Sequence, residues 1–153
     1  VGGVHLNFFI AHQLPVLPPS VFGEVPPWCR DMSFGRWADT RMAELDGTSH
    51  ALDSMTEGRP FAWSGDRRAQ LRAELDAAFF HLYGVKRDDV DYIMETFPIV
   101  KRKDIAASGE YRTKRLILEV YDAMQHAIDT GTEYQTILDP PPGEGPRHPA
   151  KES

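Results

Sequence analysis

Six lysine and arginine side chains lie close together in the second half of the chain, and their grouping is the strongest chemical signal in the sequence. They are Lys101, Arg102, Lys103, Arg112, Lys114 and Arg115. Only Asp104 and Glu110 oppose them between residues 101 and 115, so this segment carries a charge of +4 in a chain whose net charge is −6. A local positive field attracts a polyanion or an acidic partner over about one Debye length, ~8–10 Å. We therefore predict that these six residues bind the phosphate backbone of a nucleic acid.

The start of the predicted last helix supports this interpretation, because the first N–H groups of a helix have no partner within it and suit a phosphate oxygen. Three of the six cations flank that start, and an earlier predicted helix opens with a second basic group, Arg67, Arg68 and Arg72. Two alternatives stay open: the cations form a solvated helix face, or they pair within the chain. In the second case Arg112 pairs with Glu110 or Asp104. Arg115 then pairs with Glu119, four residues later.

Groups with catalytic spacing are scarce. The six histidines are scattered along the chain, with no HExxH motif and no pair four residues apart, so no metal site is predicted. Glu74 and Asp76 point about 200° apart on a helix and cannot act as one carboxylate pair. Residues 139–142 read Asp-Pro-Pro-Pro, which lacks the aromatic side chain that a base-holding Pro-Pro-aromatic loop needs. We expect no catalytic residue, metal or cofactor in this chain.

Composition is typical of an ordinary globular domain. The 153 residues are 41% hydrophobic and 26% charged, which is enough for one domain with a core. No apolar run approaches the ~18 residues that a membrane-spanning helix needs, so no membrane partner is expected. Cys29 is the only cysteine and cannot form an internal disulfide, which favours a reducing cytoplasm. Because the chain opens on Val1 without a methionine, we expect it to be a piece of a longer protein.

Hydrophobic spacing predicts a mainly α-helical fold, a bundle-like domain of four or five helices. The expected helices cover residues 34–45, 64–84, 88–97 and 110–130. Ser33, Ser64 and Asp88 have side chains that cap helix N-termini. Pro98 is expected to end the third helix and Gly131 the last. The predicted buried side of the last helix consists of Ile117, Val120, Tyr121, Met124 and Ile128.

The segments around these helices define the expected domain organisation. We expect a short strand remnant and a proline-rich connector over residues 1–30, the helical domain over 31–138, and a flexible proline-rich tail over 139–153. The strand is placed at residues 4–10, a turn of helix near 48–55, and a basic connector with one helical turn at 101–109. An uncovered strand can pair with a second copy, so a homodimer of this piece is one expected state.

Four stretches of the sequence carry a resemblance to a known family. They read HLNFFIAHQLPVLPP, RRAQLRAELDAAFFHLYGV, DDVDYIMETFPIVKRKD and GEYRTKRLILEVYDAM. In this order they resemble the C-terminal region of large single-chain adenine-specific DNA methyltransferases of type IIG-like restriction–modification and phage-defence systems. The likeness covers about half of the chain, roughly residues 5–19 and 63–125.

The resemblance implies a parent with an upstream methyltransferase fold that uses S-adenosylmethionine, a target-recognition domain, and this helical segment at the end. The parent's cofactor loop and catalytic motif are not in this chain, so methyl transfer is not expected of it, and the resemblance does not say whether the parent also cleaves DNA. The expected partners are double-stranded DNA and the upstream domains. The expected role is non-catalytic: DNA backbone contact and domain docking. The alternative is a purely structural or protein-binding module that does not touch DNA.

Overall fold

The structure is a computed structural model that describes residues 15–49 and 59–149 of the chain. This described part contains one short 3₁₀ helix and five α-helices. In chain order they are η1 (Pro19–Gly23), α2 (Phe34–Asp46), α4 (Gly65–Leu82), α5 (Arg87–Glu95), α6 (Pro98–Ser108) and α7 (Arg112–Thr130). The predicted mainly α-helical class is confirmed. The predicted strand at 4–10 and most of the predicted turn at 48–55 lie outside the described residues.

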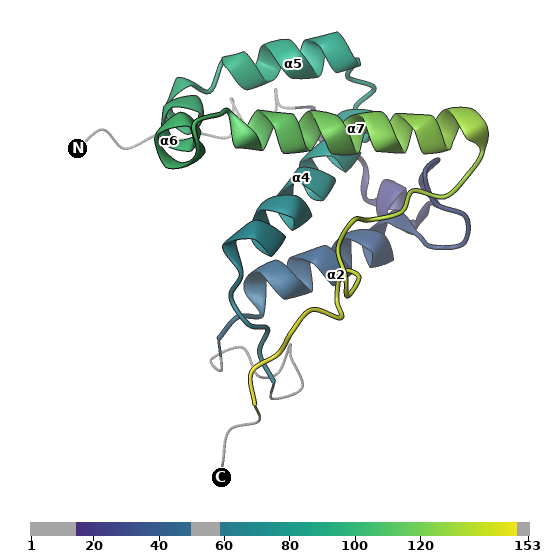
Figure 1. Ribbon diagram of the computed structural model, residues 1–153. Helices are drawn as coiled ribbons and strands as arrows, with labels where there is room; N and C mark the ends of the chain where they lie inside the picture. Colours follow the sequence, from purple (N-terminus) through teal and green to yellow (C-terminus); the bar gives the residue numbers. More distant parts are fainter. Residues whose placement is uncertain (1–14, 50–58, 150–153) are drawn as a thin grey trace, which may run out of the picture.

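Helices α4 and α7 form the centre of the fold, and α7 crosses α4 in Figure 1. Helix α5 runs beside α7, while α6 lies at the end of α7 where that helix begins. Helix α2 packs against α4 and against η1. This arrangement places the basic segment, which spans α6 and the start of α7, at one end of the molecule.

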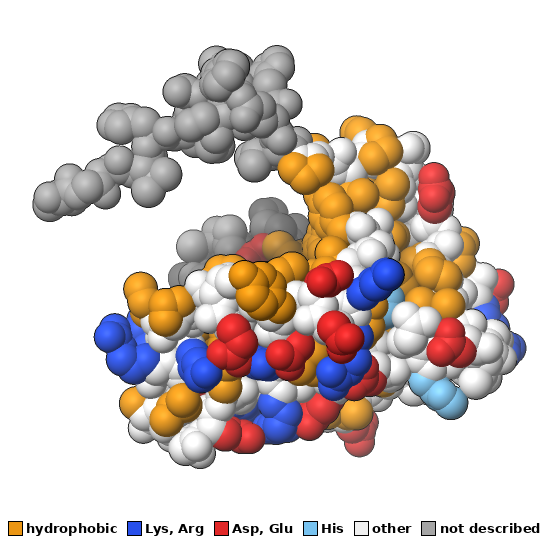
Figure 2. All heavy atoms as spheres, turned by 90° about the horizontal axis from the view of Figure 1, so that it is seen from above, with side chains coloured by type: hydrophobic (Ala, Val, Ile, Leu, Met, Phe, Trp, Pro, Cys, Tyr) orange, Lys and Arg blue, Asp and Glu red, His pale blue; other side chains and the backbone are white. Residues whose placement is uncertain are grey.

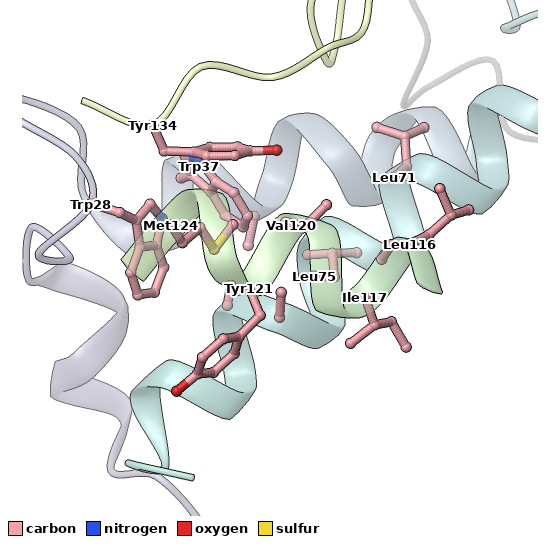
Figure 3. Close-up of a cluster of buried hydrophobic side chains, with 14 of the residues drawn as sticks. Trp28, Trp37, Leu71, Leu75, Leu116, Ile117, Val120, Tyr121, Met124 and Tyr134 are labelled. Atoms are coloured by element: carbon pink, nitrogen blue, oxygen red, sulfur yellow. The ribbon is translucent and has the colours of Figure 1, made fainter. Parts of the chain in front are cut away.

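The core is a cluster of apolar side chains from α2, α4 and α7 (Figure 3). Four of the five side chains predicted for the buried side of α7 are buried, and Ile128 is partly buried. Leu71 and Leu75 of α4 lie beside them, and Trp28 and Trp37 close one end of the cluster. Burying one such side chain contributes about 1.5–3 kcal/mol, so the contact of α4 with α7 is a main source of stability.

Trp28 ties the proline-rich connector to this core. It is fully buried, and its ring meets those of Phe34 and Trp37 edge-on, at centroid distances of 6.4 and 5.9 Å. The backbone carbonyl of Trp28 also accepts a hydrogen bond from the N–H of Tyr134, at 2.9 Å. The part of the connector around Trp28 therefore belongs to the packed domain.

Most helix ends follow the expected local chemistry. The side chains of Ser33 and Ser64 accept hydrogen bonds from backbone N–H groups three residues later, so both predicted caps are confirmed. Gly131 ends α7 in the left-handed conformation, with φ of 64°, which a glycine adopts without steric cost. The predicted cap at Asp88 is wrong: α5 begins one residue earlier, after Lys86, and no side chain caps it.

Helix α6 replaces the basic connector expected at residues 101–109. Pro98 occupies a first-turn position of α6, where its fixed φ suits a helix and its missing N–H leaves no bond unmade. Gly109 ends the helix with φ of 79°. Pro98 does separate two helices, as predicted, because α5 ends at Glu95. The same proline also begins the next helix, which the sequence reasoning missed.

Residues 133–149, here called the C-terminal arm, return along α2 and α4 (Figure 1). The structure differs here from the flexible tail expected from residue 139. Backbone hydrogen bonds join Ala62 to Pro146 and His148 to Pro60, at 2.7 and 2.8 Å, and Phe61 forms an isolated antiparallel bridge with Arg147. The proline-rich composition suggested too few apolar groups to order this segment, but polar contacts hold residues 139–149 instead. Residues 150–153 lie outside the described part.

Candidate functional site

The structure brings the six predicted cations to one end of the fold but pairs most of them with carboxylates. Lys114 contacts Asp91 at 2.9 Å and Glu95 at 2.6 Å. Lys101 contacts the other oxygen of Glu95, also at 2.6 Å. These two ammonium groups lower the pKa of Glu95 to about 2 by hydrogen bonding to its carboxylate. The α5 helix thus supplies the acids that neutralise cations of α6 and α7.

The two arginines at the start of α7 are also paired. Arg115 binds Glu110 at 3.0 Å and Glu119 at 2.9 Å, so the predicted i, i+4 pair with Glu119 is confirmed. Arg112 lies 2.9 Å from Asp66 at the start of α4 and forms an ion pair with neither acid that the sequence suggested. These exposed pairs contribute little to stability, since each is worth about 0–1 kcal/mol. They matter more for binding, because a cation that is already paired with a carboxylate attracts a phosphate more weakly.

An acidic side chain occupies the start of α7, where the sequence suggested a phosphate. The carboxylate of Asp104, on α6, accepts a hydrogen bond from the backbone N–H of Thr113 at 2.6 Å. A negative side chain at a helix N-terminus satisfies its unpaired donors and its dipole, as a phosphate would. One of the backbone donors that we assigned to DNA contact, the N–H of Thr113, therefore already has a partner.

Two of the six predicted cations remain open to solvent. Arg102 and Lys103 are exposed on α6 and form no ion pair with a described residue. The second basic group is divided in the same way: Arg72 is exposed and without an ion pair to the described residues, whereas Arg67 is buried. Arg68 stacks 4.1 Å above the ring of Trp63.

Figure 2 shows the molecule from the side that carries α5. On this face acidic and basic side chains are mixed, and hydrophobic side chains lie around them.

A groove opens between α4, α5, α6 and α7, which we call the α4–α6 groove. Its apolar half has a volume of about 450 Å³ and is lined by Asp76, Phe80, Ile93, Met94, Phe97, Val100, Thr113 and Ile117. The other half, about 280 Å³, adds Arg72, Asp104 and Arg112. Phe97 and the nearby Ile99 of α6 are 48% and 59% exposed. Apolar side chains left open in this way, beside polar ones, are typical of a protein-binding surface.

Asp76 lies where the two halves of the groove meet. Its side chain is open to solvent along the groove, yet the surrounding protein atoms desolvate the carboxylate and raise its pKa. Arg72, one turn earlier, lowers the pKa in part, but no described residue forms an ion pair or hydrogen bond with Asp76. The groove therefore contains one carboxylate that has no hydrogen bond or ion pair with a described residue, although the charge of Arg72 lies one turn away.

A second set of charged groups lies inside the fold, between α2, α4 and the C-terminal arm. Glu74 is fully buried and accepts hydrogen bonds from Arg41 at 2.7 Å, from Tyr134 at 3.1 Å and from the hydroxyl of Thr136. Burial and the adjacent Glu74 carboxylate raise the pKa of Tyr134. The guanidinium of Arg41 also lies 3.5 Å above the ring of Trp37. These contacts join the arm to both helices.

Glu44 and Arg67 form the second buried pair of this set. The carboxylate of Glu44 also accepts from the N–H of Gly143 at 3.0 Å, and Arg67 donates to the carbonyl of Pro141 at 3.1 Å. The charged groups of both buried pairs bond to other groups of the protein, so the two pairs are suited to holding the arm in place. Burial raises the pKa of the nearby Cys29 thiol to about 11, which disfavours the reactive thiolate form.

Arg67 and Glu74 were not among the side chains predicted to be buried, yet the structure buries both. One available signal was the spacing of Glu74, which lies three residues after Leu71 and four before Ala78, on the apolar face itself. Asp76 was considered only as a catalytic partner of Glu74 and was missed as a groove residue. No periodic signal points to Asp76, because the groove is made by residues from four helices.

Within residues 15–49 and 59–149, no group of three or more histidine, cysteine or acidic side chains is arranged to hold a metal ion. None of the helices in the same part of the chain has the length and apolar character needed to cross a bilayer. No family model matches the chain, and no match was found among curated proteins or solved structures. The resemblance to the end of adenine-specific DNA methyltransferases stays a prediction.

Proposed function

We propose that this chain is a non-catalytic helical domain that binds a protein partner through the α4–α6 groove. The observation that carries the proposal is the groove, in which Phe97 and its apolar neighbours are open to solvent beside ordered polar groups. A domain with no use for this surface would gain stability by covering it. The groove is also built from helices, which position its side chains more precisely than loops do.

The ion pairs around the groove support protein docking over DNA backbone contact. Four of the six predicted cations already contact carboxylates, and Asp104 caps the start of α7. A phosphate would have to displace these acids and approach a chain of net charge −6. An interface with another protein domain needs apolar contact surrounded by polar groups, and this surface offers both.

The resemblance names the partner in this proposal. If the chain is the last part of an adenine-specific DNA methyltransferase, the groove binds the upstream recognition or methyltransferase domain of the same parent. S-adenosylmethionine then belongs to that upstream domain, and the complex works in the cytoplasm, as the single unpaired cysteine suggests. The role of this chain is to hold the neighbouring domain in position.

The test measures binding of this chain to the upstream domains of the parent, expressed as a separate protein, by titration calorimetry. We expect Phe97→Ser to weaken binding at least tenfold, because apolar groups in the centre of an interface carry most of its energy. Serine also suits the N-cap position that Phe97 occupies, so α6 is preserved. Ile137→Ser, on the exposed arm, is the control. Equal affinity for Phe97→Ser and the native chain would contradict groove docking.

Contact with the DNA backbone is a second candidate, carried by the exposure of Arg102 and Lys103 on α6. Fluorescence anisotropy of a labelled duplex across a salt series tests it. If these residues hold DNA, affinity falls steeply as salt rises and disappears in the Arg102→Glu, Lys103→Glu variant. Arg115→Gln, which removes a cation already paired with acids, should bind DNA as the native chain does. No binding at low salt would leave protein docking as the remaining function.

A further inference from the structure

The α4–α6 groove has a distribution of charge that specifies what it can bind. Its apolar half contains one ionisable group, Asp76, at the border with the polar half. In the polar half, Asp104 accepts a hydrogen bond from the N–H of Thr113, and Arg112 pairs with Asp66. Arg72 also lines this half and lowers the pKa of Asp76 in part, but it forms no ion pair with a described residue. Asp76 is therefore the acid of the groove that has no hydrogen bond or ion pair with a described residue.

Desolvation raises the pKa of Asp76, which means that the folded chain holds this carboxylate at a cost. A neutral side chain of the same size would fit the groove without that cost. Burying the apolar surface beside Asp76 under a partner would desolvate the carboxylate further. Arg72 offsets only part of this cost, so a partner that brings a further positive charge to the same place is favoured over one that does not.

We propose that the α4–α6 groove binds a protein segment that places a lysine or arginine side chain against Asp76 and apolar side chains against Phe80 and Phe97. This inference rests on the proposed docking function and adds the chemistry of the partner. The two aromatic rings that line the groove are suited to aliphatic or aromatic side chains, while Asp76 selects for charge. A partner with an acidic residue at the same point is excluded by repulsion.

The test uses three small probes of the same shape that differ in charge: 4-phenylbutylammonium, 4-phenylbutanol and 4-phenylbutyrate. Each is titrated into the ¹⁵N-labelled full chain, and binding is followed through the amide signals of Val100 and Thr113, which line the groove. We expect the ammonium probe to bind about two- to fivefold more tightly than the alcohol, the range of a partly exposed ion pair. The carboxylate probe should bind more weakly than the alcohol.

Two variants locate the effect. Asp76→Asn should bind the ammonium and alcohol probes with equal affinity, because it keeps the shape and removes the charge. Asp89→Asn, which removes an exposed acid of α5, should keep the native preference and controls for general attraction to an acidic chain.

Each outcome bears on the proposal. Equal binding of all three probes to the native groove would overturn the role of Asp76 and leave apolar docking intact. A failure of every probe to shift Val100 or Thr113 would overturn the inference, whereas the calorimetric test with Phe97→Ser would still decide the docking function itself. Shifts of the same signals on dilution, without a probe, would identify a second copy as the occupant and overturn the separate basic partner.

Discussion

Arg41 donates its Nε–H to the carboxylate of Glu74 across 2.7 Å, and both side chains are almost fully removed from water, with 6% and 0% of their surface exposed. The pair joins α2 to α4 at the point where the C-terminal arm crosses them. Glu74 accepts two further hydrogen bonds from the arm. The buried charge on α4 thus receives hydrogen bonds from two other segments of the chain, α2 and the arm.

Removing one member of this pair should be strongly destabilising. Arg41→Met leaves Glu74 charged and buried, so we expect the free energy of unfolding to fall by about 3–5 kcal/mol in urea titrations. The double variant Arg41→Met, Glu74→Gln should regain part of this loss, since it leaves no unpaired buried charge at this position. Asp122→Asn breaks the exposed Arg87 pair and should cost less than about 1 kcal/mol. A similar loss for Asp122→Asn and Arg41→Met would show that burial is not the cause.

The arm should be sensitive to a single methyl group at Gly145. A Cβ there would lie 2.5 Å from Glu44 Oε1 and 2.8 Å from Arg67 Nε, so Gly145→Ala must displace a buried ion pair. We expect a loss of about 1–3 kcal/mol in unfolding free energy and faster proteolysis within residues 139–149. Gly65→Ala, at a glycine with open space around it, should be neutral or slightly stabilising. Unchanged proteolysis in Gly145→Ala would mean that this contact does not hold the arm.

Acid should weaken the fold through His81. Its ring stacks on Tyr121 with centroids 4.0 Å apart, and burial lowers its pKa below the ordinary value, although a hydrogen bond to the Tyr121 carbonyl opposes this in part. The unfolded chain therefore binds a proton at higher pH than the folded one. Stability is full above the unfolded pKa of about 6.5 and decreases as pH falls toward the folded pKa.

Urea unfolding at pH 7.5, 6.5 and 5.5 measures this dependence. His81→Gln should be less stable than the native chain at pH 7.5 and should lose less on acidification. His126→Gln, at an exposed histidine of α7, should follow the native curve. If the native chain and His81→Gln lose the same stability between pH 7.5 and 5.5, the dependence arises from other groups.

Lys114 should contribute stability that salt can remove. It lies between Asp91 and Glu95 and is only 17% exposed, so Lys114→Met should cost roughly 0.5–1 kcal/mol at low salt. In 1 M NaCl the difference from the native chain should shrink, because the screening length falls to ~3 Å. Arg102→Met is the control, since Arg102 has no ion pair with a described residue, and it should change stability by less than about 0.5 kcal/mol. A Lys114→Met loss that is unchanged by salt would point to packing of its aliphatic stem.

The local features of the fold were predictable from the sequence because a few adjacent residues determine them. Ser33 and Ser64 cap their helices, and Gly131 ends α7, through contacts within one turn. The apolar spacing of α7 identified its buried side for the same reason. The pair of Arg115 with Glu119 was predictable in the same way, since side chains four residues apart on a helix lie next to each other.

The remaining features depend on residues that are far apart in the sequence. Helix α6 was missed because its three adjacent cations and its proline suggested a connector, while the acid that binds Lys101 lies on α5. The burial of Glu74 follows from donors in the arm, some 60 residues later. The same holds for the candidate site, because the accessibility of each cation is decided by acids on other helices.

The hydrogen bond between Glu44 and Gly143 joins positions 99 residues apart, and this separation affects how the chain folds as it is synthesised. A ribosome adds about 5–20 residues per second, so α2 and α4 emerge seconds before the arm does. During that interval Glu44, Glu74 and their arginines lack the arm's hydrogen bonds. The nascent helices are therefore incompletely stabilised, and their final packing waits until the C-terminal arm has been synthesised.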